Sequence, residues 1–168
     1  MYAALDEANV AVQNNDVPIG AVIVHKDSII ARGHNTKELN NLATGHAEIT
    51  VIERACQFLS SWRLTDCDIY VTVEPCVMCG GAIINARIKN LYFGTRDSKS
   101  GAFGSVLDIN SLGLNHRIRV YNGILEYECR KIMVDFFKRL RLGSQSLLKN
   151  SLSSDFMRNP LVIHEPMF

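Results

Sequence analysis

The chain contains 168 residues, of which 47% are hydrophobic and 21% charged, with 18 lysines and arginines against 17 acidic residues. This length and composition predict one globular domain and exclude a disordered, fibrous or collagen-like protein. The formal net charge of +1 excludes a global field that attracts nucleic acid or an anionic membrane, so any nucleic-acid binding must depend on a local surface.

Helical and extended segments alternate along most of the chain. Apolar residues recur at helical spacing in four segments, and short apolar runs rich in β-branched residues indicate five strands. The predicted helices cover residues 1–14, 46–59, 76–86 and 125–142, and the predicted strands residues 19–24, 29–31, 69–73, 91–93 and 118–121. A polar turn joins the first two strands, and helical crossovers separate later ones. This order predicts an α/β fold with a central mixed sheet of about five strands, covered on both faces.

The pattern changes after residue 142. Gly-Ser-Gln-Ser begins at Gly143, a serine-rich stretch follows, and two prolines stand at Pro160 and Pro166. These residues break any period. We therefore expect a domain over residues 1–142 and a C-terminal extension of unknown role over residues 143–168, with at most a short helix.

The sequence also indicates the cellular compartment. No apolar run approaches the ~18 residues of a membrane span, and the start, Met-Tyr-Ala-Ala-Leu-Asp-Glu, lacks the basic and apolar regions of a signal peptide. Five cysteines in a chain that can build its own core indicate metal or catalytic use before a disulfide framework. We expect a cytoplasmic protein without a membrane partner.

The strongest local pattern is Glu-Pro-Cys-Val-Met-Cys at residues 74–79. Proline is favoured at the first position of a helix, so we expect a helix to begin beside Cys76. Cys76 and Cys79 are three residues apart on one helical face and can hold one ion. The positive end of the helix favours their thiolate forms. Alone, the pair fits a redox dithiol or half of a structural zinc site equally well.

The triplet His46-Ala47-Glu48 also opens a helix after a polar loop, so the imidazole can reach the point where the two sulfurs meet. Three protein ligands leave the fourth tetrahedral position for water, which is typical of a catalytic zinc site. Two thiolates and a neutral imidazole cancel the charge of Zn²⁺, so water there needs the help of a base. Glu48 is the candidate. Taken singly, this histidine and glutamate are more often a polar contact and a solvated charge.

Two adjacent glycines, Gly80 and Gly81, follow Cys79. Each costs about 1 kcal/mol relative to alanine inside a helix. We interpret this cost as a sign that the helix packs closely against the helix that His46 opens. The alternative is a flexible point.

The order of H-x-E and P-C-x-x-C resembles the zinc signature of the cytidine and nucleoside deaminase superfamily. Within that superfamily the sequence most resembles the bacterial tRNA-specific adenosine deaminases. The resemblance extends from about residue 1 to residue 141. It includes Asp-Val-Pro-Ile-Gly-Ala at 16–21 and Gly-His-Asn at 33–35; Ala-Arg-Ile at 86–88 and Phe-Gly-Thr-Arg-Asp-Ser-Lys-Ser-Gly-Ala at 93–102 are more specific to the tRNA branch. Ala-Thr-Gly at 43–45 departs from the Pro-Thr-Ala usual in the family, so we expect the loop before His46 to be less fixed.

This resemblance implies a three-layer α/β/α, cytidine deaminase-like fold, a homodimer, and a hydrolase that converts adenosine to inosine at the wobble position of tRNA. The implied partner is the tRNA anticodon loop. The implied cofactor is Zn²⁺, bound by His46, Cys76 and Cys79, where activated water attacks C6 of the adenine. Glu48 is then the catalytic residue, which moves protons to the ring and to the departing ammonia.

The same resemblance implies the substrate contacts. By position in the motifs, Asn35 hydrogen-bonds the purine, Val17 and Pro18 line the base pocket, and Asp97 lies near the ribose-phosphate backbone. The N–H of Ala47, near a helix start, could support developing charge. For Asn35 and Asp97 the alternative is an ordinary role in a turn.

Two other functions stay open from the residues. A deaminase of free nucleobases or nucleosides, such as guanine or cytosine, could carry the same zinc segments. A non-catalytic RNA-binding module with a structural zinc would need a fourth protein ligand, for which Cys67 and His34 are the candidates.

Overall fold

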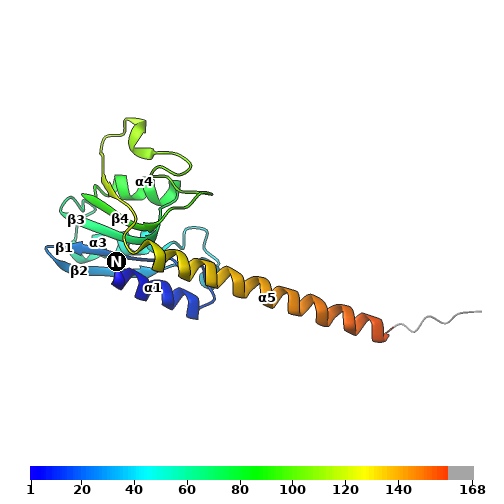
Figure 1. Cartoon of the computed structure of the whole chain (residues 1–168). Coiled ribbons are helices and arrows are strands. Elements are labelled where there is room, and N and C mark those ends of the chain that lie inside the picture. The colour runs from blue at the N-terminus through cyan, green and yellow to red at the C-terminus, as the bar shows by residue number, and fades with distance from the viewer. Residues whose placement is uncertain (159–168) are drawn as a thin grey trace, which may run out of the picture. The chain divides into compact units, whose positions relative to one another are not determined.

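The computed structural model describes residues 1–158, and of residues 143–158 the backbone alone. Residues Met1–Val134 form one compact unit, and a second begins at Asp135. The elements in chain order are α1 (Tyr2–Gln13), β1 (Gly20–His25), β2 (Ser28–His34), α2 (Lys37–Asn40), α3 (Ala47–Leu59), β3 (Cys67–Val73), α4 (Val77–Asn85), β4 (Asn90–Thr95), the 3-10 helix η1 (Ile109–Leu112), β5 (Arg119–Tyr121) and α5 (Glu126–Arg158) (Figure 1).

The five strands form one mixed sheet in the order β2-β1-β3-β4-β5. β1 pairs antiparallel with β2 and with β3, whereas β4 pairs parallel with β3 and with β5. A parallel pair needs a crossover connection, and α4 provides it between β3 and β4. The predicted five-stranded mixed sheet is confirmed.

Helices cover both faces of this sheet. A Cβ added at Gly20 would lie 2.0 Å from a carbonyl oxygen of α1, and one at Gly33 would lie 2.9 Å from a side chain of α3. Gly33 pairs with the residue after Gly20, so the two glycines face opposite sides of the pleat. A Cβ at Gly94 of β4 would meet Cys129 at the start of α5, and α4 packs beside α3. The predicted three-layer α/β/α fold is therefore confirmed.

The main core lies between the sheet and the layer of α3 and α4. Every second residue of a strand points to this face. Burial of the apolar surface of these residues drives the packing. Its fully buried side chains include Ile23, Val71, Phe93, Val51 and Ile83. This packing fixes the directions of both helices, and hence where they begin.

Two short helices, α2 and η1, are absent from the sequence prediction because a four-residue helix shows no periodicity. The helix predicted to end at Leu142 continues as α5 to Arg158. A glycine such as Gly143 costs a helix only about 1 kcal/mol, and the next proline of the chain is Pro160, so nothing in the local sequence forces an end at 142. Pro160 and Pro166 lie outside the described residues. In the part of the chain that the structure describes, no helix combines the length and apolar character needed to cross a membrane.

Candidate active site

The strands bring two helix starts to one edge of the sheet. β2 ends at His34, which pairs with Gly20. β3 ends at Val73, two residues beyond Val71, which pairs with Ala21. Both strand ends therefore lie at the same edge, and α3 and α4, which follow these strands, begin there. The positive ends of two helix dipoles thus point toward one region.

The first residue before each helix carries a side chain that can bind a metal. His46 is the N-cap of α3 and Cys76 is the N-cap of α4. Both N-caps have extended backbone, and neither side chain forms a capping hydrogen bond with its helix. The helix starts predicted from His46 and from Pro75 are thus confirmed, and the two side chains are available to each other.

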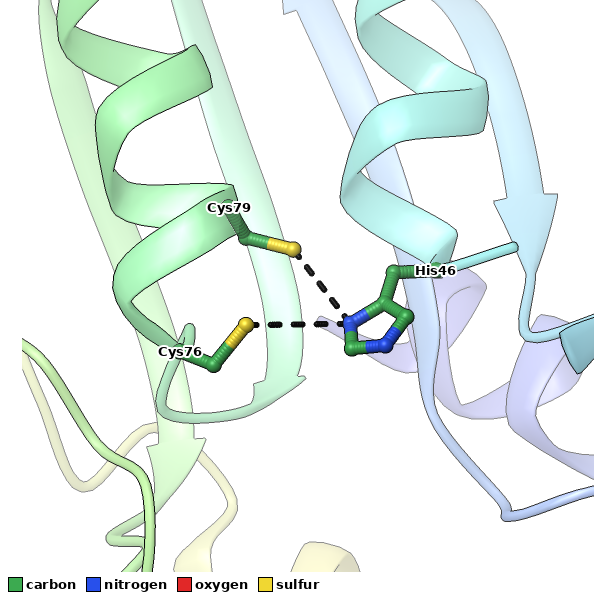
Figure 2. Close-up of side chains that lie close together, drawn as sticks. All are labelled: His46, Cys76 and Cys79. Atoms are coloured by element: carbon green, nitrogen blue, oxygen red, sulfur yellow. Dashed lines mark hydrogen bonds between the residues drawn. The ribbon is translucent and has the colours of Figure 1, made fainter. Parts of the chain in front are cut away.

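The side chains of His46, Cys76 and Cys79 converge (Figure 2). His46 Nδ1 lies 3.8 Å from Cys76 Sγ and 3.5 Å from Cys79 Sγ, and the three ligand atoms lie within 4.8 Å of one another. Zinc bonds of about 2.3 Å to sulfur and 2.0 Å to nitrogen at tetrahedral angles imply a sulfur-to-nitrogen distance of about 3.6 Å. The observed distances match this value, so the three residues fit Zn²⁺.

The metal-binding group has three members among the side chains that the structure describes. The two candidates for a fourth ligand do not belong to it. His34 Nδ1 bonds to Glu7 Oε2 at 2.9 Å, and Cys67 is buried at the first position of β3, away from the edge where that strand ends. A group of one imidazole and two sulfurs resembles a catalytic zinc site more than a closed structural one.

Glu48 is a buried carboxyl at the second position of α3. Its side chain is 3% exposed, and its Oε2 has no hydrogen-bond partner. Burial raises the pKa of Glu48 to about 7, and a backbone hydrogen bond and the charge of His46 offset this rise only in part. A carboxyl with a pKa near neutrality and a free oxygen is suited to take up and return a proton.

The pKa values of the Cys76 and Cys79 thiols are shifted in opposite directions. A hydrogen bond from Cys79 lowers the pKa of Cys76 to about 4, and the same contact raises the pKa of Cys79. The hydrogen bond to Cys76 likewise raises the pKa of His46. In the metal-free chain Cys76 is therefore the thiolate and Cys79 the donor. A metal needs both sulfurs as thiolates and the imidazole neutral, so its binding releases protons.

Asn35 lies beside the start of α3. Its side chain is 3% exposed, its Oδ1 accepts a hydrogen bond from Ala47 N at 3.1 Å, and its own N donates to the carbonyl of Ile19 at 3.0 Å. The segment that carries Val17 and Pro18 thus runs next to Asn35. The bond to Oδ1 leaves Nδ2 as the group that can donate to a substrate. The N–H of Ala47 donates to Asn35, and its role in supporting developing charge stays a prediction.

A buried aspartate ties this segment to α2. Asp16 is 0% exposed; its Oδ2 accepts from Glu38 N at 2.8 Å and Leu39 N at 3.3 Å, and its Oδ1 accepts from Val17 N at 2.8 Å. These bonds satisfy N–H groups of α2 that its own N-cap, Thr36, leaves without a side-chain acceptor. This role of Asp16 is absent from the sequence-based predictions, since the α2 N–H groups that it binds are more than 20 positions away.

The loop before His46 makes main-chain hydrogen bonds, and the expectation that it is less fixed than in the family stays a prediction. The carbonyl of Gly45 accepts from Thr36 N at 2.9 Å, and Gly45 N donates to the carbonyl of Leu42 at 3.0 Å. A Cβ at Gly45 would lie 3.0 Å from Lys37 N. Residue 45 therefore lies close to Lys37, an approach that glycine allows.

Asp97 directs its carboxylate into its own loop. Oδ1 accepts from Lys99 N at 2.9 Å, and Oδ2 accepts from the hydroxyl of Ser100. This is the turn chemistry named as the alternative, so contact with RNA stays a prediction for Asp97. Its backbone N donates to Glu74 Oε2 at 3.2 Å. The sequence analysis gave Glu74 no role, although a carboxyl between a buried strand and a proline was a signal of a buried acceptor.

The two glycines of α4 have different surroundings. A Cβ at Gly80 would lie 3.2 Å from the ring of Phe103, whereas one at Gly81 would meet nothing within 4 Å. α3 and α4 are in contact, but the close approach at Gly80 is made by the loop of Phe103. The interpretation that both glycines allow packing against α3 is wrong.

The chain is similar to known deaminases over most of its length. The family model described as MafB19-like deaminase matches residues 1–141. The chain is 40% identical over 151 residues to the tRNA-specific adenosine deaminase of Bacillus subtilis, covering 89% of this chain and 94% of that protein. It is 47% identical over 144 residues to the tRNA-specific adenosine deaminase of Rickettsia felis, covering 84% of this chain and 100% of that protein.

The fold has a solved counterpart as well. A structure from studies of A-to-I editing by tRNA:A34 deaminases at the wobble position of transfer RNA is 45% identical to this chain, with a TM-score of 0.76. The match covers 79% of this chain and 96% of the other. The region matched by the family model contains the whole metal-binding group.

Proposed function

The chain belongs to the MafB19-like deaminase family and to the tRNA-specific adenosine deaminases, and from this premise we propose that it hydrolyses adenosine to inosine at the wobble position of a tRNA anticodon. Its membership confirms the resemblance inferred from the motifs. The observation that carries the proposal is the meeting of His46, Cys76 and Cys79 at the starts of two helices, α3 and α4; α3 also carries the buried Glu48.

The ligand group fits Zn²⁺, and we propose that His46, Cys76 and Cys79 hold it. Bound zinc would supply the Lewis-acid activation of water that hydrolytic deamination requires. Glu48 takes up a proton from the attacking water at its free Oε2 and delivers it to the purine ring. It then takes the proton of the hydroxyl group added at C6 and passes it to the amino group, which leaves as ammonia. The buried and unpartnered Oε2 supports this role, and such general acid–base catalysis is worth roughly 10² to 10⁴ in rate.

The substrate-facing residues follow from the same arrangement. Asn35 donates from Nδ2 to an acceptor on the purine, and its bond to Ala47 N holds the amide in this orientation. Val17 and Pro18 line the base pocket beside it. Asp97 lies at the ribose-phosphate backbone. An anticodon loop is single-stranded, so extruding its base costs little, which agrees with a net charge of only +1.

We also propose a cytoplasmic homodimer. Apolar side chains that are more than a third exposed on α4 and around η1 support an interface between two copies: Val77, Met78, Val106, Leu107 and Leu112. Light scattering during gel filtration should give the mass of two chains at micromolar concentration. The mass of one chain would contradict the dimer.

Deamination of defined RNAs tests the function. Zinc-loaded protein is incubated with an anticodon stem-loop that carries adenosine at the wobble position, with the same stem-loop in which that adenosine is moved by one nucleotide, and with free adenosine and free guanine. Inosine in the digested RNA and released ammonia are measured by mass spectrometry and an enzyme-coupled assay. We expect inosine from the first RNA alone.

The other outcomes separate the alternatives. Turnover of free adenosine or guanine without turnover of either stem-loop would reject the tRNA substrate and favour a free-base or nucleoside deaminase. Full zinc content without ammonia from any substrate would reject the enzyme and favour an RNA-binding module. The Glu48→Gln protein serves as the control for ammonia that does not come from the site.

A further inference from the structure

Glu74 is a buried carboxyl that the proposed chemistry does not use. Its side chain is 3% exposed. It follows Val73, the last residue of β3, and precedes Pro75 and the metal-binding Cys76. Burying a carboxylate costs free energy unless hydrogen-bond donors surround it. The hydrogen-bond partners of Glu74 therefore indicate its role.

The donors all come from one loop, residues 97–105. Glu74 Oε1 accepts from Phe103 N at 2.9 Å and from Ser105 N at 3.1 Å. Oε2 accepts from Asp97 N at 3.2 Å and from the hydroxyl of Ser105. One carboxylate thus binds both ends of loop 97–105 through four hydrogen bonds, and bonds to an ionised acceptor are stronger than neutral ones.

The same loop rests on the start of α4. Ala102 N donates to the carbonyl of Pro75 at 2.9 Å, and Gly101 forms an isolated β-bridge with Cys76. A Cβ at Gly101 would lie 2.5 Å from the carboxyl carbon of Glu74, so glycine is required where the loop passes the carboxylate. Loop 97–105 therefore contacts the two residues that open α4.

Two further main-chain hydrogen bonds lie within the loop region itself. Gly101 N donates to the carbonyl of Asp97 at 3.0 Å, and Val106 N donates to the carbonyl of Gly101 at 3.0 Å. Both bonds stay inside the loop region and shape it without anchoring it. The bond from Asp97 N instead reaches Glu74, the residue that follows β3.

We propose that Glu74 is a positioning residue: it fixes loop 97–105 to the metal-ligand segment and so sets where Asp97 and the loop's backbone meet the RNA strand around the reacting adenosine. The inference rests on the proposed function, since it concerns how that substrate is held. Glu74 acts on substrate binding and not on proton transfer, because its carboxylate is occupied by the loop's donors.

Glu74→Gln tests this role with little change of shape. Its amide nitrogen cannot accept the N–H groups that one carboxylate oxygen now accepts, so one end of loop 97–105 loses its anchor. Asp108→Asn is the matched control, a carboxyl-to-amide change outside the loop at a side chain that accepts from Asn110 N at 3.0 Å. Zinc content, kcat and KM with the anticodon stem-loop, stem-loop affinity by fluorescence anisotropy, and amide hydrogen exchange are measured for each protein.

We expect Glu74→Gln to raise KM and the dissociation constant about fivefold, the effect of one lost hydrogen bond of average strength, with kcat per bound zinc within about twofold of the wild type. Amide exchange should accelerate in residues 97–105 and not in α4. Asp108→Asn should behave as the wild type in all four measurements. Should Glu74→Gln not fold, Ser105→Ala removes one donor to Glu74 and should raise KM about threefold.

Unchanged KM and unchanged exchange in the loop would overturn the inference. So would a fall in kcat at constant KM or a loss of zinc, since either places Glu74 in the chemistry or in the metal site. A wild-type protein that deaminates no stem-loop would instead overturn the proposed function, and the exchange and affinity measurements would then still decide whether Glu74 anchors the loop.

Discussion

Glu48→Gln separates what this residue does for the reaction from what it costs the fold. Glu48 is 3% exposed, its Oε2 has no hydrogen-bond partner, and burial raises its pKa to about 7. Glutamine has nearly the same shape, carries no charge and cannot take up a proton. We therefore expect the variant to lose activity without losing stability.

The size of the stability effect follows from the pKa of Glu48. The ordinary value for this carboxyl is 4.5, against about 7 in the folded metal-free chain. A pKa raised by folding leaves the full stability below the unfolded value, and stability is lost as the pH rises toward the folded value. At pH 7 the loss is about 3 kcal/mol, taking 1.36 kcal/mol per pKa unit. The neutral acid of the wild type also has an unpartnered atom at Oε2, so the amide adds little extra cost. Glu48→Gln should therefore gain about 3 kcal/mol at pH 7 and about nothing at pH 4.

Two measurements check the expected effects on stability and on activity. Urea denaturation of the metal-free wild type and variant between pH 4 and pH 7 gives the difference in unfolding free energy, which should grow with pH in favour of the variant. Deamination of the anticodon stem-loop by the zinc-loaded proteins should show kcat lower by roughly 10² to 10⁴ in the variant. A variant with wild-type kcat, or a difference in unfolding free energy that does not change with pH, would refute the reasoning.

Further variants test the packing and the thiols. Gly94→Ala should lower the unfolding free energy by about 3 kcal/mol, because the new Cβ would lie 2.3 Å from a sulfur of α5, whereas Gly81→Ala, with nothing within 4 Å, should raise it by up to about 1 kcal/mol; thermal denaturation decides, and equal effects would contradict the packing. Asp16→Ala leaves two N–H groups of α2 without acceptors and should cost about 2 kcal/mol or more, so urea denaturation identical to the wild type would rule that contact out as a stabilising one. In the metal-free chain at pH 7, iodoacetamide should label Cys76 first, since its hydrogen bond with the neighbouring thiol lowers its pKa to about 4, and Cys67 late, since burial raises its pKa to about 11. Zn²⁺ should protect Cys76, and peptide mass spectrometry that finds equal rates for the two thiols would count against the assignment.

The metal-binding group could be predicted because its signals are local. Pro75 marks a helix start, Cys76 and Cys79 share a face by their spacing, and His46 follows a polar loop at another helix start. A sheet whose strands end at one edge then brings two such starts together. Each step uses a property of neighbouring residues, and the fold adds only the meeting point.

The buried carboxylates could not be placed in the same way. Asp16 bonds to N–H groups 22 and 23 residues away, and Glu74 to N–H groups 23, 29 and 31 residues away. Every residue except proline offers a backbone N–H, so the donors leave no trace in the sequence. The close approach at Gly80 was misassigned for a similar reason, because its partner, Phe103, belongs to a loop without periodicity.

X-ray absorption at the zinc edge of the loaded protein is the most direct test of the metal centre. One imidazole, two thiolates and one open position predict one zinc per chain, with two sulfurs at about 2.3 Å and two nitrogen or oxygen neighbours at about 2.0 to 2.2 Å. Three or more sulfurs around the ion, or a protein that retains no zinc after dialysis, would contradict a catalytic centre built from His46, Cys76 and Cys79.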